Sequence, residues 1–249
     1  MNLANHTWFE FFLGAVAFQY LRYLVLCGGL YYLFWVVLKP WTAKRRVFAA
    51  DFVRADLWRE ARDSFWFCVI TSVPIAFALV PEYRAYTKLY FDMHDHPVWW
   101  LPVSFLLLLF GQDAYFYWIH RLMHTRWIYK HVHSVHHKSL NPSPFTAFAM
   151  HPAEGLLLFG YIFSFVWVVP THFYVFTLFQ IISMALNING HFGAEFQPES
   201  WKQVPFLKHM NRSTLHTGHH RFFTVNYGLY FTFWDRWMKT LKENLGRSA

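Results

Sequence analysis

The chain has 249 residues, of which 55% are hydrophobic, 22% aromatic and only 14% charged. Soluble domains usually carry about a quarter charged residues, so this composition argues against a protein surrounded by water on all sides. The net charge of +8 suits an anionic membrane surface, whereas a nucleic-acid-binding protein would combine a basic face with a more polar chain. We expect residues 1–249 to form one membrane-embedded domain.

The first apolar stretch runs from Phe11 to Leu38 and is interrupted by Gln19 and Arg22. It is long enough for one membrane span, because about 20 residues cross a bilayer. Basic residues follow it in Lys44–Arg46. Positive charge favours the cytoplasmic side of a membrane, so we expect the loop after this span to be cytoplasmic.

The next segment, Trp41–Ser64, mixes apolar and charged residues. Its apolar Phe48, Phe52 and Ala55 recur at helical spacing among arginines and aspartates. This pattern predicts a helix, either one that lies in the membrane interface or an ordinary connecting helix.

Four further apolar runs follow: Phe65–Val80, Val98–Ile119, Leu156–Val169 and Phe173–Leu186. The last two are separated by Pro170–His172, which predicts a helical hairpin that crosses the membrane or re-enters it. The expected fold class is therefore all-α, an integral membrane bundle of about four to five embedded helices with a cytosolic helical cap. Counting the spans places every dense histidine cluster on the cytoplasmic side, in either a bacterial inner membrane or the endoplasmic reticulum.

Histidine is unusually frequent, with 16 copies. Eight of them form three clusters: His120 and His124; His133, His136 and His137; His216, His219 and His220. Positions three and four apart lie on one face of a helix, so we expect each cluster to aim its rings at one point. Isolated histidines are usually surface or packing residues, which we apply to His6, His94, His96, His172 and His209.

Eight clustered imidazoles are too many for one zinc ion and suit two metal ions, each with about four to six ligands. His191 follows the last apolar run and is expected to be a ninth ligand. Asn187 and Glu195 each lie four residues from His191. Either could join it at the metal, directly or through water. The zinc hydrolase motif HExxH does not occur, which argues against a membrane zinc hydrolase.

The order of several motifs is informative. They are Asp113-Ala-Tyr-Phe-Tyr-Trp-Ile-His120-Arg-Leu-Met-His124, His133-Ser-Val-His136-His137-Lys138, Asn141-Pro-Ser-Pro-Phe145, His151-Pro-Ala-Glu154, His216-Thr-Gly-His219-His220, Asn226-Tyr-Gly228 and Phe233-Trp-Asp235-Arg236. Together they span residues 113–240 and resemble the fatty acid hydroxylase / sterol desaturase superfamily of integral-membrane di-iron enzymes. The Pro-Ser-Pro-Phe and Asn-Tyr-Gly segments are most similar to C-5 sterol desaturases and their bacterial relatives.

This resemblance implies that the eight clustered histidines bind two iron ions. His191 matches a single histidine that family members often carry between the second and third clusters, and the tenth ligand position is left open. The implied activity is an O2-dependent hydroxylation or desaturation of a membrane lipid. Its alternatives are hydroxylation of an acyl lipid or carotenoid and, in another class, a histidine-rich membrane metal transporter.

Ligating histidines usually donate their second N–H to a carboxylate or carbonyl. Asp113 lies seven residues before His120 on the same helical face, as a partner of the metal ligands or an interfacial anchor. Glu154, Asp235 and His151 are further candidates. No haem, flavin or dinucleotide motif occurs, so electrons are expected from an external donor such as a cytochrome b5-like protein or ferredoxin.

Basic residues lie near the histidine clusters: Arg121, Arg126, Lys130, Lys138, Arg212 and Arg221. They suit the docking of an acidic electron donor. The ordinary excess of positive charge on the cytoplasmic side of a membrane protein explains them as well.

Overall fold

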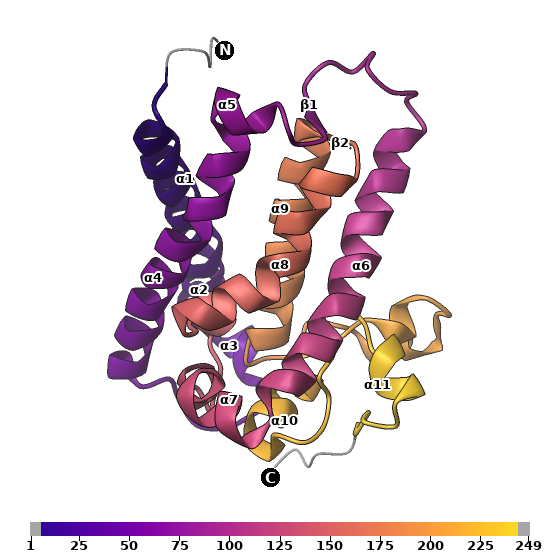
Figure 1. Cartoon of the computed structure of the whole chain (residues 1–249). Helices are drawn as coiled ribbons and strands as arrows, with labels where there is room; N and C mark the ends of the chain where they lie inside the picture. Colours follow the sequence, from indigo (N-terminus) through magenta and orange to yellow (C-terminus); the bar gives the residue numbers. More distant parts are fainter. Residues whose placement is uncertain (1–5, 244–249) are drawn as a thin grey trace.

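The computed structural model describes residues 6–243, which form an all-α bundle with a cap of short helices at one end (Figure 1). The predicted fold class is confirmed. The first helical stretch, Trp8–Val37, consists of α1 (Trp8–Tyr23), the π-helical turns η2 (Leu24–Gly28) and η3 (Tyr32–Val37), and α2 (Gly29–Tyr31) between them. Thr7 caps its start, because its hydroxyl accepts from the Glu10 amide and the Glu10 carboxylate accepts from the Thr7 amide.

The helix predicted within Trp41–Ser64 does not form as expected. A short helix α3 (Lys39–Ala43) is followed by irregular chain, and α4 begins only at Arg54. The Val47 amide donates to the Gly193 carbonyl at 3.0 Å, and the Glu195 amide donates to the Arg45 carbonyl at 2.8 Å. These backbone groups are engaged by a distant segment and are therefore lost to helical hydrogen bonding.

The other predicted apolar runs are all helical, in α4 (Arg54–Leu79), α6 (Trp100–Met123), α8 (Pro152–Val168) and α9 (Phe173–His191). Helix α4 packs against α1 and α8, and α6 packs against α8 and α9. Three helical stretches of the described chain are long and apolar enough to cross a membrane, namely Trp8–Val37, α4 and α9. Helix α8 is a shorter apolar helix, and α6, with 24 residues, carries the buried Gln112 and Asp113.

The predicted hairpin of α8 and α9 is present, and its turn is held by a small parallel sheet that the sequence did not predict. Strand β2 (Thr171–His172) pairs with β1 (Leu89–Tyr90), which follows α5 (Pro81–Arg84). The indole of Trp100 donates to the Pro170 carbonyl at 2.7 Å. This end of the bundle, at the top of Figure 1, is therefore held together by contacts between two connections, the one between α5 and α6 and the one between α8 and α9.

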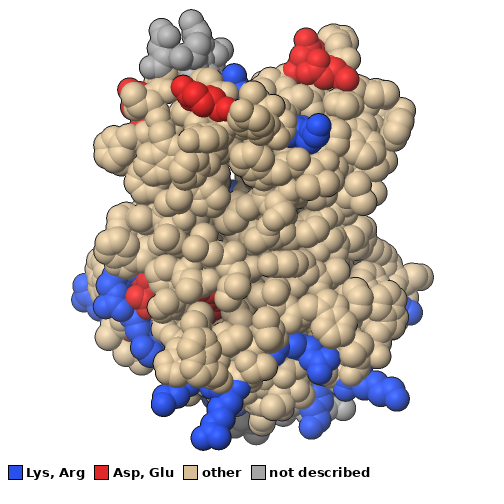
Figure 2. All heavy atoms as spheres, viewed as in Figure 1, with Lys and Arg blue, Asp and Glu red and all other residues tan. Residues whose placement is uncertain are grey.

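The opposite end carries the short elements of the cap: α7 (Arg126–His131), η4 (His133–Lys138), η5 (Pro144–Phe148), η6 (Glu199–Gln203), η7 (Leu207–His209), α10 (Ser213–Phe222) and α11 (Phe233–Trp237). The dense histidine clusters lie here. Figure 2 shows lysines and arginines gathered at this end, whereas acidic residues are prominent at the other. The two ends of the molecule thus differ in both structure and charge.

Candidate metal centre

Four elements bring the clustered histidines together at the cap end of the bundle. His120 lies in the last turn of α6 and His124 caps that helix. The second cluster is carried by the 3₁₀ helix η4, the third by α10, and His191 is the last residue of α9. All of these side chains are buried except His124, which is partly buried.

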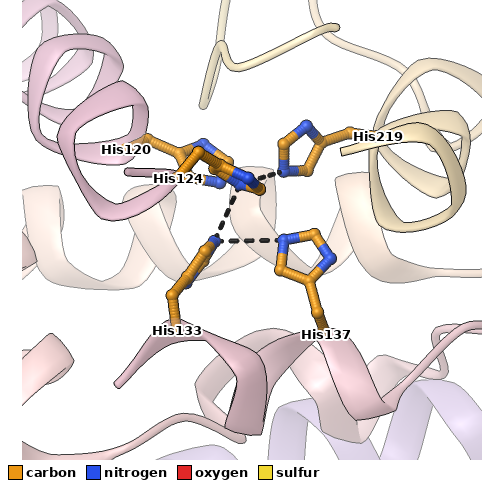
Figure 3. Close-up of side chains that lie close together, drawn as sticks. All are labelled: His120, His124, His133, His137 and His219. Atoms are coloured by element: carbon orange, nitrogen blue, oxygen red, sulfur yellow. Dashed lines mark hydrogen bonds between the residues drawn. The ribbon is translucent and has the colours of Figure 1, made fainter. Parts of the chain in front are cut away.

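The nine imidazoles form two groups. The first contains His120, His124, His133, His137 and His219, and the second contains His136, His191, His216 and His220. Within each group, one nitrogen from every ring lies within 4.8 Å of the corresponding nitrogen of every other ring. Figure 3 shows the rings of the first group converging from α6, η4 and α10. Each group has the number and closeness of nitrogens that one metal ion requires.

Each histidine triple is divided between the two groups, which corrects the expectation that each triple aims at one point. His133 and His137 belong to the first group, whereas His136 between them belongs to the second. The third cluster is divided in the opposite sense, with only His219 in the first group. In the α-helix α10, residues four apart differ by about 40° in direction, whereas the residue at the third position points about 100° away from the fourth, which explains why His219 is separated from His216 and His220. The second cluster lies on the 3₁₀ helix η4, so this periodicity does not explain its division.

Distances between ring nitrogens match those of neighbouring metal ligands. In the first group the Nε2 atoms are separated by 3.1 Å between His124 and His219, 3.1 Å between His133 and His124, and 3.0 Å between His137 and His133. In the second group the separations are 3.2 Å for His191 and His136 and 2.9 Å for His216 and His191. Two nitrogens at right angles around a metal, each about 2.1 Å from it, lie about 3.0 Å apart.

Where a backbone carbonyl contacts Nδ1, the tautomer leaves Nε2 with a lone pair rather than a proton. The Nδ1 atoms of four histidines contact backbone carbonyls: His120 with Tyr227 at 2.9 Å, His136 with Ala149 at 3.1 Å, His191 with Asn187 at 2.9 Å, and His219 with Val225 at 2.6 Å. A carbonyl only accepts, so Nδ1 carries the single proton of each neutral ring. The Nε2 lone pairs of His136 and His191 consequently face each other, and a cation between them satisfies both. The residues fit a metal.

Burial keeps these rings in the neutral form that binds metal. Loss of hydration lowers the pKa of His136 to about 4, against an ordinary value of 6.5, and lowers the pKa of His137 and of His220 well below it. Neighbouring histidines lower the last two further. The site is therefore uncharged at neutral pH before any metal binds.

The sequence predicted several side chains as hydrogen-bonding partners of the metal ligands. Within residues 6–243, Glu154 is the one among them that lies at hydrogen-bonding distance from a clustered histidine. Its Oε1 lies 2.8 Å from His133 Nδ1, and both residues are buried. Asp235 accepts from the Tyr227 and Gly228 amides at 2.9 and 2.8 Å, and so holds the turn whose carbonyl accepts from His120.

The other candidates have different contacts. Asp113 accepts from the Tyr230 and Phe231 amides at 2.8 and 3.1 Å. His151 caps α8 by accepting from the Ala153 amide. The Asn187 amide donates to the Ala147 carbonyl, and Glu195 accepts from the Thr214 hydroxyl at 2.9 Å. Asn187 contributes its backbone carbonyl to the site, and the Glu195 carboxylate lies outside the two groups.

Comparison with known proteins identifies the family of this arrangement. The sequence model of the family described as fatty acid hydroxylase matches residues 105–240, which include all nine histidines. The chain belongs to the fatty acid hydroxylase family. This confirms the superfamily that the motifs predicted.

Sterol-modifying enzymes are among the similar proteins. The chain is 40% identical to lathosterol oxidase of Rattus norvegicus over 169 residues, covering 66% of this chain and 54% of that protein. It is 36% identical to lathosterol oxidase of Homo sapiens over 214 residues, covering 84% of this chain and 67% of that protein. A Delta(7)-sterol 5(6)-desaturase of Gibberella zeae is 31% identical over 194 residues, covering 75% of this chain and 56% of that protein. The chain thus spans between about half and two thirds of these relatives, and no solved structure matches it.

The predicted similarity to sterol desaturases agrees with the names of these relatives. Closeness to bacterial members of the fatty acid hydroxylase family stays a prediction.

Several residues that shape the centre of this family member were not predicted. The Glu60 carboxylate on α4 accepts from the hydroxyls of Ser139 and Ser143 at 2.6 and 2.5 Å, and so holds the loop after the second cluster. The backbone carbonyls of Tyr227, Ala149 and Val225 accept from the rings of His120, His136 and His219. Every residue has a backbone carbonyl, so the sequence cannot indicate which of them will accept. The apolar spacing of α4 also gives no reason to single out Glu60.

A small cavity of about 30 Å³ lies on the bundle side of the histidines. Its lining includes Phe116, His120, His133, Glu154 and Tyr230. It touches rings of both groups, since His136 and His191 also line it. A group that enters this cavity from the bundle would meet the metal centre directly.

Proposed function

We propose that this protein is an O2-dependent membrane di-iron oxidoreductase that removes hydrogen from a lipid, in the manner of a sterol desaturase. The observation that supports this most strongly is the pair of adjacent histidine groups, whose nitrogen lone pairs converge inside a buried centre. The names of the relatives, lathosterol oxidase and sterol 5(6)-desaturase, support the oxidation of a sterol.

Each histidine group would hold one iron ion, with five nitrogen ligands in the first group and four in the second. The unequal count suits an open position for oxygen or substrate at the second ion, which corresponds to the unassigned tenth ligand. Iron held in this way supplies the activation of O2 that an unactivated C–H bond requires.

The chain itself supplies orientation and exclusion of water. Carbonyls and Glu154 hold the Nδ1 protons, so that each Nε2 faces the centre. Phe116 and Tyr230 close the bundle side of the centre. Buried surroundings of this kind protect a reactive oxidant from solvent and aim it at one bound carbon.

We propose that the cap faces the cytoplasm and receives electrons there. The basic residues at the cap end agree with the positive-inside rule. Exposed side chains of Arg126, Lys130, Lys138 and Arg221 would attract an acidic donor such as a cytochrome b5-like protein or ferredoxin. Arg212, expected in the same role, is buried and does not belong to this surface.

Two alternative functions are a hydroxylase that acts on another lipid and a metal transporter that oxidises no lipid. A hydroxylase of an acyl lipid or carotenoid would use the same centre on another substrate. A metal transporter is not favoured, because the relatives named above are oxidoreductases.

The test is an analysis of sterols and other lipids in cells that express the chain, with and without oxygen. We expect an O2-dependent loss of two hydrogens from a sterol, abolished by His136→Ala. An unchanged lipid profile together with metal uptake into vesicles would contradict the proposal. An O2-dependent change confined to acyl lipids or carotenoids would reassign the substrate.

A further inference from the structure

A second, larger cavity lies in the half of the bundle away from the cap. Its volume is about 490 Å³, and its walls come from α1, α4, α8 and α9. Apolar side chains such as Phe11, Phe18, Ile162 and Phe176 form most of the lining. Ligand cavities in proteins usually have about 300–1,000 Å³, so this space suits one small lipid.

The large cavity lies directly above the small one beside the histidines. On α8, Ile162 lines the large cavity and Leu158 the small one. On α9, Gln180 lines the large cavity and Ser183 the small one. Residues three or four apart are separated by about 5 Å along a helix, so the linings of the two cavities follow each other within about one helical turn on both α8 and α9.

Two polar side chains line the apolar cavity without a hydrogen-bonding partner in the described chain. Gln180 is 8% exposed and makes no hydrogen bond. Within residues 6–243, Arg22 makes neither a hydrogen bond nor an ion pair, and its Nε is buried. Its guanidinium carbon lies 5.6 Å from the centre of the Phe18 ring, a cation–π contact. Gln19 beside them differs, since its amide donates to the Ser72 hydroxyl at 2.7 Å and to the Cys68 carbonyl at 3.3 Å.

The position of Arg22 makes its lack of a partner significant. It lies at the middle of the helical stretch Trp8–Val37, which has 30 residues. The surface of a bilayer is about 15 Å from its centre, too far for an arginine side chain to reach. A polar side chain at this depth is costly unless it has a partner, and the partner can be a bound molecule.

We propose that Arg22 and Gln180 bind the hydroxyl group of a sterol that occupies the large cavity with its hydroxyl end toward the metal centre. This rests on the proposed function and names the orientation of the substrate. The guanidinium and the Gln180 amide donate to the hydroxyl oxygen, and the amide oxygen accepts the hydroxyl proton. An uncharged hydroxyl suits a lining that is mostly apolar, with Arg22 and Gln180 nearer the small cavity and His6 and Glu10 at the start of α1, away from it.

The chemistry of a sterol explains why the hydroxyl end enters first. The hydroxyl is on C3, and C5 is two bonds away, whereas the side chain leaves the opposite end of the ring system. C5 and C6 therefore lie nearer the metals when the hydroxyl end, rather than the side chain, is the inner end of the bound sterol. Along α1, Phe11 and Arg22 line the cavity and lie about 16 Å apart, which accommodates the fused rings and the start of the side chain.

The test measures binding to metal-free protein in phosphatidylcholine nanodiscs, so that it does not depend on turnover. The ligands are a radiolabelled Δ7-sterol, its 3-deoxy analogue without the oxygen, and a C18 fatty acid. The variants are Arg22→Gln and Gln180→Leu. The matched control is Arg62→Gln, which changes an arginine that is exposed on α4 and paired with Asp63.

We expect each of the two cavity variants to weaken binding of the sterol about tenfold and to leave binding of the 3-deoxy analogue unchanged. The Arg62→Gln control should bind both ligands as the original protein does. An equal loss for both ligands would mean that the variants only reshape the cavity, and would overturn the proposal. Tighter binding of the fatty acid, dependent on Arg22, would overturn the sterol assignment.

If the proposed function is wrong and the binding of the sterol hydroxyl is right, the result differs from those above. The protein would then bind the sterol through Arg22 and Gln180 but would leave it unoxidised when loaded with iron and supplied with O2 and electrons.

Discussion

At the scale of single residues, the centre depends on where each imidazole proton lies. Backbone carbonyls fix Nδ1 as the protonated atom in His120, His136, His191 and His219, and Glu154 Oε1 lies 2.8 Å from His133 Nδ1. The lone pairs on Nε2 are then directed inward before any metal binds. Predictions at this scale concern the proton-holding partner and the ligand itself.

Replacing Glu154 tests the proton-holding partner. Glu154→Leu removes the acceptor of the His133 N–H, and we expect the affinity for iron to fall about 10–100-fold. Glu154→Gln keeps an acceptor oxygen and should retain most of that affinity. Iron remaining on each variant during titration with a chelator measures the difference. Equal affinities for the Leu and Gln variants would show that the contact has no effect on metal binding.

Replacing His136 tests a ligand against a matched histidine. His136→Ala should abolish product formation and lower the iron content, while leaving membrane insertion intact. His131→Ala is the control, because His131 is exposed, contacts the Trp127 carbonyl and lies outside both metal groups. Activity of the His136 variant at the level of the control would remove His136 from the ligand set.

At the scale of elements, the sequence predicted the long helices and failed where distant segments meet. Apolar runs of membrane length predicted α1, α4, α6, α8 and α9. Each of these helices contacts either the protein core or lipid along its apolar run, so the residues there are mostly apolar. The irregular residues 44–53 were wrongly expected to be helical. Their backbone partners lie near Gly193, and spacing within the segment carries no information about them.

The histidine clusters show the same limit. Their composition and order predicted that a metal centre exists, and His191 was predicted from one position in the chain. The division of each triple between two groups was not predicted, because it depends on how η4 and α10 face each other. The acceptor carbonyls could not be predicted either, since every residue has one.

A glycine in the turn between α10 and α11 tests how that turn supports the centre. A Cβ on Gly228 would collide with the Phe231 carbonyl oxygen and lie 2.8 Å from Asp235 Oδ2. Gly228→Ala should therefore displace the turn whose Tyr227 carbonyl accepts from His120, and lower both thermal stability and iron content. Gly14→Ala is a matched control, because a Cβ there meets nothing within 4 Å. Equal iron content in the two variants would contradict this role of the turn.

At the scale of the whole molecule, the bundle buries eight of the nine imidazoles at one end, where His124 is partly buried, and lysines and arginines gather at the same end. Buried imidazoles are stable without a metal only in the neutral form, because burial disfavours the charged form. Burial of these rings therefore makes stability depend on pH.

Stability of the metal-free protein should fall on acidification. In the unfolded chain a histidine binds a proton near pH 6.5, whereas the folded His136 has a pKa of about 4. The unfolded state therefore binds more protons between these values, so stability is fully present above about pH 6.5 and is lost as the pH falls toward 4. From His136 alone, we expect a loss of about 2 kcal/mol between pH 7 and pH 5.

Thermal unfolding of the metal-free protein in detergent at these two pH values measures this effect. An unfolding temperature that does not change between pH 7 and pH 5 would contradict burial of the neutral rings. Bound metal should be released over the same range, because only neutral imidazoles bind it.

A di-iron centre in the two histidine groups is tested by the number of metal ions per chain. Iron and zinc are measured in the purified protein and in two variants, His124→Ala in the first histidine group and His216→Ala in the second. We expect two irons per chain in the original protein and fewer than two in each variant. One zinc per chain, or iron content unaffected by either substitution, would contradict a di-iron centre.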